Sequence, residues 1–196
     1  MGYTNNTIPR SGGRIALPNW SKETAFLQNK NYEFRKAGLL DIPFIFNLIQ
    51  DGCEMGSFTE KFITSKGWGR ILKILFLDVL APHRNIEHEG YDTKLLVFTL
   101  NDEEVGFMKI DRFTDRDIYE IELCAVAQEY RNQKIGLQMI RMFIEDLPSG
   151  ATIVAYCTKY SRAMQHILKM LKFQRDKKPS VLHSELFHFT KSSHMT

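Results

Sequence analysis

Apolar residues recur along the chain with two different periods, which predict strands in some segments and helices in others. Short apolar or alternating runs bounded by turn residues predict strands at 32–36, 95–100, 105–113, 118–127, 152–157 and 182–190. Apolar residues at helical spacing predict one helix that begins after Asp41 and three more at 62–80, 135–147 and 161–171. Asn101-Asp102 is typical of a tight turn, so the second and third strands are expected to form a hairpin.

Several polar or helix-breaking residues set the expected limits of these elements. Asp41 is expected to cap its helix, with Pro43 in the first turn. Gly67 and Gly69 are expected to interrupt the second helical region, and Pro82 to end it. Residues 83–93 are predicted to be a polar loop, because they carry few apolar side chains.

The order of elements indicates one domain of the α/β (α+β) class built around a single sheet. A chain of 196 residues is expected to hold one domain. Residues 1–30 are rich in Asn, Gly, Ser and Thr and are predicted to be an extension that is mostly loop. The domain is expected to cover 31–190, followed by a tail at 191–196.

Composition limits the classes of protein that this chain can belong to. The apolar fraction of 43% and the aromatic fraction of 12% suffice for a real core. A net charge of +3 gives no reason to expect a nucleic-acid partner, and no apolar stretch approaches the length of a membrane span. The three cysteines predict neither a disulfide framework nor a zinc site, and the histidines do not cluster, so no metal is expected. A reducing, cytoplasmic setting is expected.

The segment around residues 120–147 carries the chemistry most clearly. A predicted strand, Glu120–Val126, is followed by a short turn and by a helix that opens near Gly136. The first turn of a helix exposes unpaired N–H groups at the positive end of the helix dipole. Such a helix start is suited to phosphate groups, so a phosphate-bearing cofactor is expected beside the two carboxylates of the strand.

Several local sequences in their order resemble the GNAT superfamily of acetyl-CoA-dependent N-acetyltransferases. The similar segments are Tyr32–Ala37, Val105–Phe107, Leu123–Val126, Tyr130–Gly136 and Ile167–Phe173. The resemblance covers roughly residues 32–190. It implies a mixed, twisted sheet of about six or seven strands flanked by about four helices, with acetyl-CoA as co-substrate.

The resemblance also assigns candidate residues for coenzyme A. The backbone of Cys124, Ala125 and Val126 would bond to the pantetheine amides as an additional strand does. Pyrophosphate binding would fall to the turn and the first helical turn, which comprise Arg131, Asn132, Gln133, Lys134, Ile135, Gly136 and Leu137. Ser161 stands near the cofactor in the family, although helix capping alone would explain it. A second interpretation leaves Arg131 and Lys134 solvated and makes Gly136 a packing residue.

Two positions depart from the family pattern. Lys134 stands where the first glycine of the pattern is usual, and Leu168 stands where many members carry the tyrosine that protonates the departing thiolate. Tyr156 or Tyr160 can supply the missing hydroxyl, although tyrosine is also common as a packing residue. Tyr160 is the stronger candidate of the two.

Glu120 and Glu122 are the candidate bases, because strand residues two apart face the same side of a sheet. A partly buried carboxylate has a raised pKa and can take a proton from an amine. The alternative pairs both with Arg35, Lys36 or Lys109 as structural ions.

The resemblance therefore implies an acetyltransferase that acts on a primary amine of a small molecule, a peptide or a protein. The alternative function is a catalytically silent GNAT-like module that binds a partner. The extension at 1–30 is expected either to cover the acceptor cleft or to mediate formation of a homodimer.

Overall fold

The computed structural model describes residues 31–59, 65–81, 83–86, 89–113, 116–176 and 186–192. The predicted extension at 1–30 lies outside these residues, as do 193–196 of the predicted tail. The first two residues of that tail belong instead to the last strand, which ends at Ser192.

The described residues form one mixed sheet with four α-helices, which confirms the predicted fold class. The strands are β1 (Tyr32–Lys36), β2 (His83–Ile86), β3 (Glu89–Leu100), β4 (Glu103–Phe113), β5 (Ile118–Val126), β6 (Thr152–Cys157), β7 (Gln174–Arg175) and β8 (Phe187–Ser192). The helices are α2 (Ile42–Glu54), α3 (Ser65–Leu80), α4 (Ile135–Glu145) and α5 (Arg162–Met170), with short 3-10 turns η1 (Leu39–Asp41) and η3 (Gln128–Tyr130).

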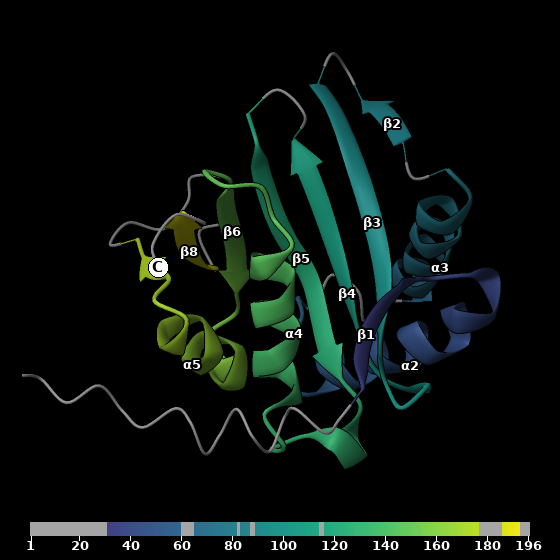
Figure 1. Cartoon of the computed structure of the whole chain (residues 1–196). Coiled ribbons are helices and arrows are strands. Elements are labelled where there is room, and N and C mark those ends of the chain that lie inside the picture. Colours follow the sequence, from purple (N-terminus) through teal and green to yellow (C-terminus); the bar gives the residue numbers. More distant parts are fainter. Residues whose placement is uncertain are drawn as a thin grey trace, which may run out of the picture. The chain divides into compact units, whose positions relative to one another are not determined.

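The strands lie in the order β1-β3-β4-β5-β6-β8-β7, and β2 pairs with β3 beside this row. Neighbouring strands are antiparallel except for β5 and β6, which are parallel. The parallel pair joins the N-terminal part of the sheet to its C-terminal part, with α4 as the crossover (Figure 1).

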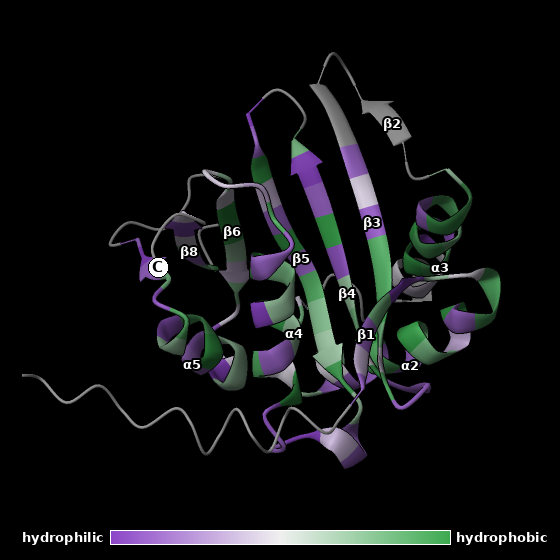
Figure 2. Cartoon of the chain, viewed as in Figure 1, coloured by the Kyte–Doolittle hydropathy of each residue, from purple (hydrophilic) through white to green (hydrophobic). Residues whose placement is uncertain are grey.

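Each face of the sheet is covered by a different pair of helices. One core contains Met139, Ile140 and Leu168 from α4 and α5, and the other contains Ile45, Ile49 and Leu75 from α2 and α3. Figure 2 shows hydrophilic as well as hydrophobic residues along β4. Of the hydrophilic ones, Lys109 lies 3.9 Å from Asp78 on α3 and therefore faces the α2–α3 side. None of the described helices has the length and apolar character needed to cross a bilayer.

The predicted helix breaks at Gly67 and Gly69 and the predicted loop at 83–93 are wrong. Gly67 and Gly69 lie inside α3, where the cost of a helical glycine, about 1 kcal/mol each, is outweighed by packing of the apolar face. The predicted polar loop at 83–93 contains β2 and the first part of β3, paired from His83↔Asp92 to Ile86↔Glu89. Strand pairing is made by backbone groups, so the short β2 and the polar start of β3 left little trace in the apolar pattern.

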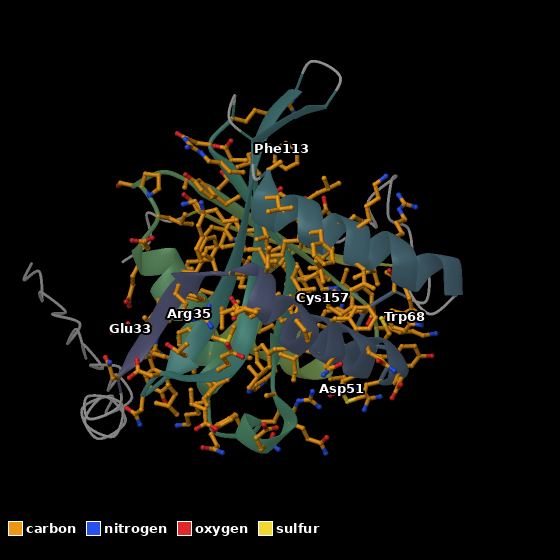
Figure 3. The ribbon with its side chains drawn as sticks, turned by 90° about the vertical axis from the view of Figure 1, so that its right-hand side faces the viewer. Glu33, Arg35, Asp51, Trp68, Phe113 and Cys157 are labelled. Atoms are coloured by element: carbon orange, nitrogen blue, oxygen red, sulfur yellow. The ribbon has the colours of Figure 1, made fainter. Side chains whose placement is uncertain are left out.

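Asp41 precedes α2 as predicted, but its carboxylate does not cap that helix. The two carboxylate oxygens accept hydrogen bonds from Arg35 on β1 at 2.6 and 2.8 Å, and one also accepts from the Gly38 amide at 2.6 Å. Arg35, which is labelled in Figure 3, also donates to Glu104 at 2.6 Å. The Arg35 guanidinium lowers the pKa of Asp41 to about 2, against an ordinary value of 3.8. This network joins β1 to the start of α2.

Candidate active site

The parallel strands β5 and β6 separate part of the way along their length. Their pairing covers Ile118–Ile121 and Thr152–Ala155, whereas β5 continues beside β4 as far as Val126, which pairs with Gly106. Residues 122–126 therefore have a strand on one edge only. The other edge presents backbone donors and acceptors to whatever enters between the two strands.

A β-bulge on β5 lies at the point of separation. Lys109 on β4 pairs with Leu123 and the next residue, Ile110, pairs with Ile121, so Glu122 is the extra residue. A bulge bends the strand that carries it and increases its twist. Such a bend is suited to carry the end of β5 away from β6, whose pairing with β5 stops at Ile121↔Ala155. We call the space between the unpaired ends of the two strands the gap.

Gly106 allows β4 to follow β5 closely beyond the bulge. A Cβ atom at this position would lie 2.6 Å from the Ala125 backbone oxygen and 3.2 Å from the Met139 sulfur. No side chain fits at that distance without a shift of the backbone. This glycine therefore fixes the position of the β5 segment that is predicted to bind pantetheine.

The predicted phosphate turn has the left-handed backbone that the family pattern assigns to glycine. Lys134 has φ 62° and ψ 10° and stands directly before α4 as its N-cap, and Asn132 also has φ 62°. The first α4 bond runs from the Gln138 amide to the Lys134 oxygen at 3.0 Å. The amides of the first turn thus have no acceptor within the helix and point out of its N-terminal end.

Other predicted residues of the turn hold it in place. Arg131 donates from Nε to the Val126 oxygen at 2.9 Å and lies 3.4 Å from the Met55 sulfur at the end of α2. Gln133 donates to the Glu129 oxygen at 3.0 Å. The structure thus connects the turn to the end of β5 and to α2.

Gly136 is a packing residue in this geometry. A Cβ there would be 3.2 Å from Ile167 Cδ1 on α5 and 3.6 Å from Val126 Cγ2. The absence of a side chain lets α4 approach α5 and the end of β5, and it keeps the first turn of α4 uncovered.

The two glutamates of β5 have different surroundings. Glu122 pairs with Lys109, whose side chain is 5% exposed and whose ammonium also lies 3.2 Å from Asp111 and 3.9 Å from Asp78 on α3. A buried lysine requires such partners, because an unpaired buried charge is strongly destabilising. The predicted pairing with Lys109 is therefore correct for Glu122. Asp78 is distant in sequence from Lys109, whereas Asp111 is two residues away on the same strand and was not predicted as a partner.

Glu120 forms no ion pair among the described residues and is half-buried. Burial raises the pKa of Glu120 above its ordinary value of 4.5, and the charge of Asp111 raises it further. Lys109 and His188 act in the opposite direction. Arg35, one predicted partner, is instead bound to Asp41 and Glu104. Glu120 thus differs from Glu122 in that no ion pair among the described residues holds it.

The loop after β6 is tied to the end of α2. Ser161 does not cap α5 with its side chain, because its hydroxyl donates to the Ser57 oxygen at 2.6 Å. Thr158 donates to the Gly56 oxygen at 2.8 Å. Tyr160 is 56% exposed and its ring packs against the α-carbon of Gly56, 3.0 Å from the position of an added Cβ. These contacts brace the loop, and they place the candidate Tyr160 on its outer side.

The cysteines near the gap are core residues. Burial raises the pKa of Cys124 and of Cys157 to about 12. Cys157, labelled in Figure 3, belongs to the core on the α4–α5 face, and Cys124 packs against that core. A protonated thiol is a poor nucleophile, so these residues are suited to packing rather than to covalent catalysis.

A cavity of about 220 Å³ lies elsewhere, under the C-terminal end of α4. It is bordered by Tyr119, Phe143 and Asp146 among others, at the end of β5 opposite to the gap. The convergence of carboxylates and open strand edge therefore marks the candidate site better than the cavity does.

Comparisons with known proteins agree with this geometry. The family model described as the acetyltransferase (GNAT) family matches residues 62–173. A search of curated proteins finds no match.

Many solved structures share the fold. The ribosomal-protein-S18-alanine N-acetyltransferase from Escherichia coli is 14% identical, with a TM-score of 0.57 over 85% of this chain and 96% of its own. A chimera of the spermidine N-acetyltransferase from Vibrio cholerae and hSSAT is 11% identical, with a TM-score of 0.60 over 83% and 95%. The ribosomal L7/L12 alpha-N-protein acetyltransferase in complex with coenzyme A is 12% identical, with a TM-score of 0.57 over 82% and 93%.

Proposed function

The chain belongs to the GNAT acetyltransferase family, and from this premise we propose that it transfers an acetyl group from acetyl-CoA to a primary amine. The observation that carries the proposal is the separation of β5 from β6 after Ile121, beside the half-buried Glu120. The strand edge, which would bind the acyl donor, and the carboxylate, which would face the amine, are therefore adjacent. An acyl transfer between two bound substrates requires such proximity. The three cysteines are free, which fits a reducing, cytoplasmic compartment.

The residues present fit coenzyme A. The open edge of residues 124–126 supplies the donors and acceptors that two amides of an extended pantetheine arm need. The amides from Gln133 to Leu137, with the charge of Lys134, bind the pyrophosphate at the start of α4. Arg131 and Asn132 shape that turn, and Ser161 fixes the neighbouring loop. The bound co-substrate supplies an activated acetyl thioester.

In the proposed reaction, Glu120 accepts a proton from the acceptor ammonium, directly or through a water molecule. Its raised pKa brings it closer to the neutral range in which such a base works. Glu122 stays paired with Lys109 and supports the bulge that opens the gap. The strand amides polarise the thioester carbonyl as the amine attacks it.

The charge around the site favours a cationic acceptor. The carboxylates of Asp78, Asp111 and Glu122 lie within ion-pair distance of the Lys109 ammonium. Glu120 interacts with the same ammonium at longer range, so carboxylates outnumber the cation here. An alkylammonium group can approach this face with a favourable electrostatic energy. Solved relatives are named for spermidine and for ribosomal-protein acceptors, so both small amines and peptide N-termini belong in the search.

The test is release of free coenzyme A from acetyl-CoA over a panel of diamines, polyamines, amino acids and N-terminal peptides. We expect release with at least one class, and loss of that release in Glu120→Gln. Glu145→Gln, which makes the same change at an exposed position of α4, is the matched control and retains the activity.

A second function, that of a catalytically silent module, is favoured by one observation. The α5 segment Arg162–Met170 contains no tyrosine, and Leu168 stands at the position where many family members have one. Saturable acetyl-CoA binding without release over the whole panel would support the silent module and refute the enzyme.

A further inference from the structure

Leu168 replaces the tyrosine that many family members use as general acid, so another residue must supply that proton. Leu168 is 0% exposed within the α4–α5 core and has no polar atom in its side chain. Tyr160 is largely exposed and lies over Gly56. Leu168 thus has no proton to donate, and the described contacts of the Tyr160 ring are with Gly56 and Lys159 rather than with β5.

Tyr156 occupies the apex of that gap. The last pair of β5 and β6 is Ile121↔Ala155, so Tyr156 is the first residue of β6 beyond the paired segment. Val154 pairs with Glu120, and strand residues two apart face the same side, so Tyr156 faces the side that carries Glu120. A charge interaction with Glu120 raises the pKa of Tyr156, after the larger effect of burial. Its hydroxyl therefore stays protonated over the neutral range.

Two residues from the C-terminal part of the sheet fix the orientation of this ring. Tyr156 pairs with His188 on β8, and the two rings stack with centroids 4.8 Å apart and planes inclined by 22°. His188 Nδ1 lies 2.6 Å from the Asp176 carboxylate, and the Asp176 amide donates to the His188 oxygen at 3.0 Å. A carboxylate bonded to Nδ1 fixes the orientation of the imidazole, and the stacked imidazole limits rotation of the phenol.

We propose that Tyr156 is the general acid of the acyl transfer and that His188 and Asp176 are its positioning residues. The proposal rests on the acetyltransferase function proposed above. The amine nitrogen forms a bond to the thioester carbonyl carbon, the C–S bond breaks, and its electron pair goes to sulfur. Tyr156 gives its hydroxyl proton to that sulfur to yield the free thiol. The proton that leaves the new amide nitrogen restores the phenol, while Glu120 holds the proton first taken from the ammonium.

This face of the sheet holds several other groups that titrate or carry charge, and they are the background of any pH measurement. They are Glu120 and Glu122 on β5, Lys109 and Asp111 on β4, Asp78 on α3, His188 on β8 and Asp176 after β7. A base and an acid together predict a bell-shaped dependence of kcat on pH, with Glu120 on the acid limb and Tyr156 on the basic limb.

The test compares Tyr156→Phe with Tyr119→Phe and Tyr160→Phe, which each remove another tyrosine hydroxyl. Tyr156→Phe is expected to lower kcat by about 10²-fold or more, to leave KM for acetyl-CoA nearly unchanged and to abolish the basic limb. Tyr119→Phe, which acts on the opposite face of β5, retains the wild-type kcat and pH profile. Asp176→Asn lowers kcat by up to about 10²-fold through misorientation, and Asp176→Glu restores part of it.

The outcomes separate this proposal from the one on which it rests. A wild-type protein that releases coenzyme A, with a Tyr156→Phe variant of equal kcat and intact basic limb, overturns the assignment of Tyr156 alone. Loss of kcat in Tyr160→Phe with normal Tyr156→Phe overturns it as well. Failure of the wild-type protein to turn over any amine refutes the acetyltransferase function itself.

Discussion

The left-handed backbone at Lys134 gives a stability prediction that tests the geometry of the phosphate turn. A residue with a Cβ atom loses about 1–2 kcal/mol in this conformation, because the Cβ crowds the following carbonyl group. Glycine avoids that loss but gains unfolded-state freedom that costs about 0.4–1 kcal/mol. We therefore expect Lys134→Gly to be more stable than Lys134→Ala by about 0.5–1 kcal/mol. Both variants remove the lysine charge, so their difference reports the backbone alone.

Thermal unfolding followed by circular dichroism measures this difference. For a chain of this size, each kcal/mol shifts Tm by about 2–4 °C, so the glycine variant should melt about 1–4 °C above the alanine variant. The matched control is Lys169 in the last turn of α5, where Lys169→Gly should be less stable than Lys169→Ala by up to about 1 kcal/mol. Opposite orders at the two lysines confirm the turn, whereas an alanine variant at 134 that is as stable as the glycine variant refutes it.

Acetyl-CoA binding supplies the second part of this prediction. Removal of the Lys134 charge is expected to weaken binding by about 1 kcal/mol, roughly fivefold, if the ammonium lies near 4 Å from a phosphate in solvent. The glycine variant should bind more tightly than the alanine variant, because its backbone can approach the phosphates more closely. Unchanged affinity in both variants would show that this turn does not contact the phosphates.

Three further predictions follow from buried groups. Glu120→Gln should lower kcat by about 10²–10⁴-fold while raising Tm at neutral pH, because burial disfavours the charged carboxylate; a lower Tm would instead indicate a structural ion. Asp41→Asn should lower the free energy of unfolding in urea by about 2 kcal/mol at neutral pH. The difference from wild type should vanish as the pH falls from 3.8 through 2, because the lowered pKa of the folded state stabilises only the ionised form. A difference that persists at pH 2 would contradict this. Gly106→Ala should destabilise the domain by about 1–3 kcal/mol, since its Cβ meets the Ala125 oxygen at 2.6 Å, and a neutral result in the same unfolding assay would contradict the close approach of β4 to β5.

Local sequence patterns predicted most of the fold because the core elements carry strong apolar periodicity. The strands β1, β4, β5 and β6 and the helices α4 and α5 lie where the pattern placed them, within a few residues. The pattern failed for β2, for the first part of β3 and for β7, which are short or peripheral and are held largely by backbone bonds. It also placed breaks at glycines that α3 accommodates.

The site could be predicted in outline but not in its charge pairing. The turn, the helix start and the two glutamates are consecutive in sequence, so local reasoning could find them. The carboxylates around Lys109 lie on α3, β4 and β5. The bulge at Glu122 depends on the register between β4 and β5, which no local pattern encodes. The same holds for His188, whose partner Asp176 is brought to it by the β7–β8 pairing.

Gly136→Trp is a poor test of cofactor binding, because the packing around Gly136 leaves little room for a side chain. An added side chain meets Ile167 and Val126 at once, so an indole would disturb the contact of α4 with α5 as well as the phosphate turn. The variants at Lys134 are more specific, because that side chain is exposed.

The most direct test of the central claim is a calorimetric titration of the full chain with acetyl-CoA, repeated with Lys134→Ala. The gap beside β5 predicts saturable binding at one site, weakened roughly fivefold in the variant, and a stabilisation of about 2.7 kcal/mol at a ligand concentration of 100 times Kd. Absence of heat and of any Tm shift at millimolar acetyl-CoA would contradict the account, since neither an acetyltransferase nor its proposed site is possible without that binding.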